Sequence, residues 1–145
     1  MTEESSSVLG RPSEWPAAVK VYLATLMLLA LLLVAYGGAM GLYFVHSDDF
    51  DLLERARLSH VHFNGHVYLF AIVGLPFALA AARKRWTLAA FPLLAAAIVA
   101  HAAALLLVED NVTSGWVIGS ASLLSALLAL MAVIVLAALI RRKPV

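Results

Sequence analysis

Four long apolar stretches, separated by short polar segments, divide this chain at about residues 17–45, 58–82, 86–108 and 113–140. A transmembrane helix needs about 20 apolar residues, because each residue adds about 1.5 Å and the hydrocarbon core is about 30 Å thick. Each stretch is long enough. The pattern therefore predicts an all-α fold, with residues 16–145 forming one bundle of four transmembrane helices. The connections are short, so neighbouring helices are expected to be antiparallel.

Residues 1–15 are polar, lack a signal-peptide layout and are expected to form a cytoplasmic tail.

Composition supports a membrane protein and narrows its chemistry. Of its residues, 63% are hydrophobic and 13% are charged. In soluble domains, about 45–50% of the residues are apolar and about 25% are charged. The net charge of +1 gives no reason to expect nucleic acid as a partner. The absence of cysteine excludes disulfides, thiolate zinc sites, iron–sulfur clusters and covalent c-type haem. No nucleophile, P-loop or nucleotide-binding motif is present either, so we do not expect an enzyme acting alone.

The basic residues predict the orientation. They gather at one end of the predicted bundle, at Lys20, in the loop 83–85 and in the tail 141–143, whereas acidic residues dominate the other end. Cytoplasmic loops are enriched in Lys and Arg. The pattern therefore predicts a multi-pass protein of a bacterial-type inner (cytoplasmic) membrane, with both termini in the cytoplasm.

Small residues predict close helix contacts. Gly37 and Gly41 are four apart on the first predicted helix, as are Gly115 and Gly119 on the fourth. Such pairs let helix backbones approach each other in membranes. We expect partners beyond the lipid bilayer to be other membrane subunits or a second copy of the chain.

The five histidines form the most informative feature, because the predicted topology puts all of them in the outer half of the membrane. They are His46, His60, His62, His66 and His101. His62 and His66 are four residues apart, hence on one face of the second helix. His66 and His101 should both lie roughly 10–13 Å below the outer polar edge. Gly65 and the alanines around His101 are expected to leave room beside these rings.

Three interpretations of the histidines stay open. Two imidazoles facing each other could hold haem b, with His66 and His101 as the axial pair and His62 as a substitute. Three imidazoles could hold copper or zinc through His62, His66 and His101, with His60 and His46 as additional ligands. Alternatively, the rings only make interhelical hydrogen bonds, or relay protons.

A resemblance bears on this choice. The segment RARLSHVHFNGHVYLFAIVGLPFALAA, residues 55–81, resembles a helix of haem–copper oxidase subunit I. It is similar, in particular, to short four-helix proteins described as cytochrome-oxidase-subunit-I-like, with a His-x-His at the start of one span, here His60 and His62. The resemblance implies haem binding. The full oxidase set of histidines is absent, so it does not imply oxygen reduction.

The sequence thus predicts a small integral membrane protein that binds haem b for electron transfer or as a subunit of a respiratory complex. A copper or zinc protein for metal handling or assembly is one alternative. A cofactor-free accessory subunit of a larger membrane complex is the other.

Overall fold

The structure is a computed structural model that describes residues 12–46, 48–107 and 115–141. Its elements are a short 3₁₀ turn and four α-helices: η1 (Pro12–Glu14), α1 (Ala17–His46), α2 (Phe50–Ala80), α3 (Thr87–Leu107) and α4 (Gly115–Arg141). All four helices are long and apolar enough to cross a membrane. The predicted all-helical fold with four membrane-length helices is therefore confirmed.

The second helix begins eight residues earlier than the apolar pattern predicts, at Phe50 instead of residue 58. Asp49 caps it, because its side chain accepts a hydrogen bond from the backbone N–H of Leu52 at 3.0 Å. Asp51 lies in the first turn, where a negative charge favours the helix dipole, and Glu54 pairs with Arg57 at 3.2 Å. Hydropathy marks only the part of a helix that suits lipid. It therefore misses this charged extension.

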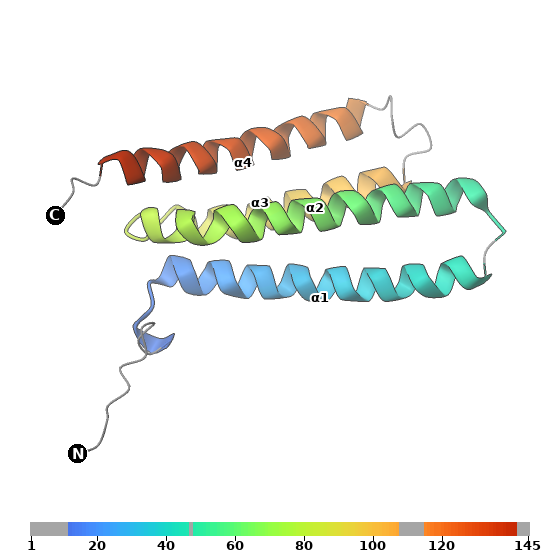
Figure 1. Cartoon of the computed structure of the whole chain (residues 1–145), viewed down its shortest axis with the longest axis horizontal. Coiled ribbons are helices and arrows are strands. Elements are labelled where there is room, and N and C mark those ends of the chain that lie inside the picture. Colours follow the sequence, from blue (N-terminus) through green and yellow to red (C-terminus); the bar gives the residue numbers. More distant parts are fainter. Residues whose placement is uncertain (1–11, 47, 108–114, 142–145) are drawn as a thin grey trace, which may run out of the picture.

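The helices pack with α2 and α3 side by side in the middle of the bundle. In Figure 1, α1 lies on one side of this pair and α4 on the other, and each helix begins near the end of the bundle where the previous one finished. Both α1 and α4 contact α2 and α3, but the described residues of α1 and α4 do not contact each other. The bundle thus has two separate interfaces, one for each outer helix.

An aromatic core fills the interface of α1 with α2 and α3. The ring of Tyr22 on α1 lies 5.4 Å from the rings of both Phe70 and Phe91, and its hydroxyl donates to the carbonyl of Ala71 at 2.8 Å. Gly74 makes this possible, because a Cβ on it would collide with the Tyr22 ring. This close approach fixes the position of α1 against α2.

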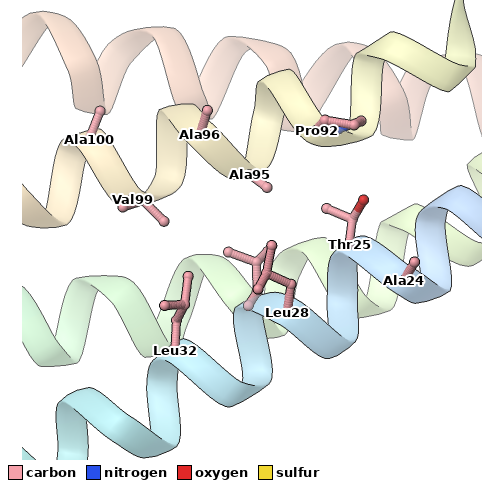
Figure 2. A pocket seen from close by; sticks show the side chains of 10 residues that line it. Ala24, Thr25, Leu28, Leu32, Pro92, Ala95, Ala96, Val99 and Ala100 are labelled. Atoms are coloured by element: carbon pink, nitrogen blue, oxygen red, sulfur yellow. The ribbon is translucent and has the colours of Figure 1, made fainter.

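A groove of about 590 Å³ runs between α1 and α3. Figure 2 shows Leu28 and Leu32 of α1 facing Ala95 and Val99 of α3 across it. Its lining is apolar apart from Thr25, whose hydroxyl already donates to Val21 of the same helix at 2.8 Å. The lining includes no histidine, so the polar chemistry of the bundle lies elsewhere.

A histidine cluster between α2, α3 and α4

Three histidines from two helices converge in the half of the bundle that contains the α1–α2 connection. His62 and His66 come from α2 and His101 from α3, and each offers a ring nitrogen within 4.8 Å of the other two. The ring centres of His66 and His101 are 5.2 Å apart, and those of His62 and His101 are 5.5 Å apart. The spacing of four residues places His62 and His66 one helical turn apart, with ring centres 6.2 Å from each other.

The backbone of α2 orients His66. Its Nδ1 lies 2.7 Å from the carbonyl oxygen of His62. A carbonyl only accepts hydrogen bonds, so Nδ1 must carry the proton in this contact. The lone pair of the neutral ring is then on Nε2, which is the state that a metal ligand requires.

A serine on α4 orients His101 in the same way. The Nδ1 of His101 lies 2.8 Å from Ser120 Oγ, which itself lies 3.0 Å from the carbonyl of Val117. The hydroxyl has one hydrogen and gives it to Val117, so it accepts the Nδ1–H of His101. The Nε2 of His101 therefore holds a lone pair, and it faces Nδ1 of His62 at 3.4 Å. That lone pair only accepts, so Nδ1 of His62 carries the proton in this contact and the lone pair of His62 is on its Nε2. The His62 ring must turn before all three unprotonated nitrogens meet at one point.

A second serine holds the two histidine helices together beside the cluster. Ser59 is buried on α2 and donates to the carbonyl of Ala102 on α3 at 2.6 Å. Ser59 precedes His62 by one turn, and Ala102 follows His101 directly. The hydrogen bond therefore sets the relative height of the ligand-bearing segments.

The three rings differ in exposure. His101 is only 1% exposed, His66 is half-buried and His62 is exposed. The cluster is therefore closed on the side of α3 and α4 and accessible on the side of His62. An ion held here would keep a position open to a fourth ligand, as catalytic and exchangeable zinc sites do.

The structure places the other two histidines elsewhere. His60 faces α1, where its ring lies edge-on to Tyr36 with centres 5.6 Å apart and its Cε1 lies against Gly37. Its Nδ1 is buried without a hydrogen-bond partner among the described residues. His46 is exposed at the end of α1. Neither residue is part of the cluster, so they are not additional ligands in this arrangement.

Two features of the site differ from what the sequence indicates. In the sequence, Ser120 belongs to a face of small residues on α4. Its spacing does not indicate that its side chain forms a hydrogen bond with a histidine of α3. Gly65 is expected beside the histidines, but it is exposed and no neighbouring side chain lies within 4 Å of where its Cβ would be. Gly65 follows His62 by three residues, and its face of α2 points outward instead of toward α3.

No protein-family model, curated protein or solved structure significantly matches this chain. The resemblance of residues 55–81 to haem–copper oxidase subunit I thus stays a hypothesis.

Proposed function

We propose that this chain is a small integral membrane protein that binds one transition-metal ion, zinc or copper, through His62, His66 and His101. Its role is metal handling or the assembly of a larger membrane enzyme. The observation that carries this proposal is the convergence of three ring nitrogens within 4.8 Å, with Nδ1 of two of the rings hydrogen-bonded to a neighbouring oxygen.

The ring separations favour a bare ion over a haem. Three imidazoles on one tetrahedral ion, with metal–nitrogen bonds of about 2.0–2.1 Å, place their ring centres about 5–5.5 Å apart. The cluster has 5.2, 5.5 and 6.2 Å. A haem between His66 and His101 would need a wide flat space between these rings, and His62 lies close to both. An ion needs only a small adjustment of side chains already in place.

The ligand types favour zinc or copper. Imidazole nitrogens bind both zinc and copper, so these three ligands do not distinguish between the two metals. Because all three ligands are neutral, the bound ion keeps its charge in a region of low dielectric. A fourth ligand, either water or a group from a partner, would enter on the exposed side at His62.

The surroundings favour exchange at one face over transport across the membrane. Toward the opposite end of the bundle, the buried side chains of α3 and α4 are apolar as far as Thr87 at the start of α3, and they include Leu94, Ile98, Leu124, Leu128 and Met131. Ions cross hydrocarbon only along polar groups or water. The cluster would thus load and release its metal on the side of the α1–α2 connection.

We infer that this side is the outer one, in an inner (cytoplasmic) membrane crossed by antiparallel helices. Lys20, Arg83–Arg85 and Arg141 lie at the end where α1 begins and α4 finishes (Figure 1). Asp48, Asp49 and Asp51 lie at the other end. The positive-inside tendency then puts both termini in the cytoplasm.

This orientation predicts that a Lys84→Cys variant in intact cells resists a membrane-impermeant thiol reagent. The native chain has no cysteine, so the signal has one source. Asp48→Cys, at the opposite end, should react and serves as the control. Rapid labelling of Lys84→Cys from outside would show that the orientation is reversed.

The metal proposal predicts that the full chain, purified in detergent and supplied with Zn²⁺ or Cu⁺, binds about one equivalent per chain. The sample should show no Soret absorption, because neither ion has a porphyrin. A Soret band in protein as purified would instead support the haem b hypothesis, with His66 and His101 as axial ligands. A colourless protein that takes up no metal would support the cofactor-free accessory subunit.

A further inference from the structure

The groove between α1 and α3 lies at the depth of one membrane leaflet. Lys20 is the last charged residue of α1 before the apolar part of the helix. At about 1.5 Å per residue, the groove residues of α1, from Ala24 to Leu32, lie about 6–18 Å beyond Lys20. One leaflet contributes about 15 Å to a hydrocarbon core about 30 Å thick. The groove therefore runs through the leaflet that borders the start of α1.

The groove stays open because other contacts set the positions of the two helices. The hydroxyl of Tyr22 ties α1 to α2, and the Tyr22 ring lies against Phe91 of α3, next to the groove. Farther along, the groove residues of α3 are mainly alanines, whose short side chains do not reach α1. On the α1 side, Leu28 is 57% exposed and Leu32 is 41% exposed. Space therefore remains between these two helices (Figure 2).

The lining selects an apolar occupant. The hydroxyl of Thr25 already donates within α1, and the other lining side chains carry no polar atom. A polar ligand would gain no new hydrogen-bond donor from these side chains. Moving a polar group there from water would therefore cost free energy without compensation.

The packing of α1 against α3 selects an occupant thinner than a helix. These two helices contact each other, and the axes of packed helices are about 8–10 Å apart. A third helix would need a similar distance from both, so its backbone would lie over the groove and only side chains would enter. A hydrocarbon tail is a single chain of methylene groups, and it can lie along the groove for its whole length.

A basic surface borders the groove at the end where α1 begins. Lys20 is exposed and lies one turn before Ala24, on the same face of α1. Its ammonium group donates to the carbonyl of Ser13 at 2.7 Å and has two further hydrogens. The connection at residues 83–85 adds three exposed cations at this end of the bundle. This charge complements the phosphate of a lipid whose tail enters the groove.

We propose that the groove between α1 and α3 binds one acyl chain of an anionic phospholipid, with the lipid phosphate at Lys20. The tail fills the apolar space, and the ammonium group holds the headgroup at the membrane surface. The lipid thus keeps a fixed place on the protein. No histidine lines the groove, so this proposal and the metal proposal stand or fall separately.

Native mass spectrometry of the full chain tests the site. After extraction in mild detergent from vesicles of equal phosphatidylglycerol and phosphatidylcholine, the parent should retain one phospholipid per chain, mostly phosphatidylglycerol. Val99→Phe should fill the groove and lose the lipid, whereas Val133→Phe, at an exposed valine of α4, should keep it. Circular dichroism checks that both variants keep their helices. A parent without lipid, or equal retention in all three proteins, would overturn the proposal.

A second pair of substitutions tests the phosphate contact. Lys20→Gln should lower the preference for phosphatidylglycerol over phosphatidylcholine about fivefold, the usual contribution of one lysine near an anionic lipid surface. Arg141→Gln removes an exposed cation from the same end of the bundle and should leave the preference unchanged. Equal effects would show that the overall surface charge selects the lipid, against a contact at Lys20. A parent dimer that Val99→Phe dissociates would show that a second copy covers the groove instead.

Discussion

Replacing His101 with alanine should abolish high-affinity metal binding, because this residue is a proposed ligand and its ring is the most firmly positioned of the three. Its ring is buried, Ser120 holds its Nδ1, and its Nε2 faces His62. Two neighbouring histidines of one helix cannot surround an ion alone. We expect the affinity to fall by more than the roughly 10–100-fold that loss of a group hydrogen-bonded to a ligand usually costs. Titration of the purified variant with Zn²⁺ measures this loss.

Two further variants separate loss of a ligand from loss of folding. His66→Ala removes a half-buried ring with little expected effect on packing, yet it should also lose the metal. Ser120→Ala keeps all three ligands but frees Nδ1 of His101, and it should weaken binding by roughly 10–100-fold. This graded order would not follow from general damage to the bundle.

His60→Ala is the matched control. It removes the same type of ring from the same helix, but this ring packs against Tyr36 and Gly37 on α1. Metal affinity should therefore stay at the level of the parent. A loss in His60→Ala equal to that in His101→Ala, with helicity intact, would show that the ligands are not those of the cluster.

Replacing Gly74 with leucine should cause the largest loss of stability among the substitutions considered. A Cβ at this position would already overlap the ring of Tyr22, which is 2% exposed and enclosed by Phe70 and Phe91. The ring cannot move without losing its hydrogen bond to Ala71. Overpacking costs roughly 1–3 kcal/mol, and the lost hydrogen bond adds roughly 0.5–1.5 kcal/mol. Thermal unfolding in detergent, followed by circular dichroism, measures the effect.

Gly38→Leu provides the control for this substitution. Gly38 is also a helical glycine, but it is exposed and no neighbouring atom lies within 4 Å of where its Cβ would be. Its unfolding temperature should stay close to that of the parent. Similar losses in both variants would show that the added side chain does not act through contact with Tyr22 at Gly74, because the higher helix propensity of leucine would by itself stabilise both helices.

The sequence predicts the helices well because the membrane imposes a length and a polarity that can be read residue by residue. The limits of α1 and α3 agree to within one residue with the apolar stretches 17–45 and 86–108. Hydropathy could not predict the start of α2, because the first turns of this helix are polar. They are stabilised by the Asp49 cap and by the ion pair of Glu54 with Arg57. Helix formation there depends on local hydrogen bonds and charges instead of hydropathy.

The candidate site was predictable where one helix decides it. The spacing of His62 and His66 puts them on one face of α2, and helix rise places His101 at a matching depth. Rotation of helices about their own axes is not readable from hydropathy. The facing of His60 toward α1, the outward position of Gly65 and the contact of Ser120 with His101 all depend on it.

The lack of contact between α1 and α4 has a thermodynamic consequence. The helices α1 and α4 pack on opposite sides of α2 and α3, with the aromatic core on the α1 side and the hydrogen bond of Ser120 to His101 on the α4 side, and one hydrophobic cluster continues through both sides. Free-energy changes at distant sites without shared partners usually add. Substitutions on α1 and on α4 that contact no common residue of α2 or α3 should therefore combine additively in double-mutant cycles. Selection could then alter the proposed metal site on the α4 side while the sequence of the aromatic core on the α1 side changes independently.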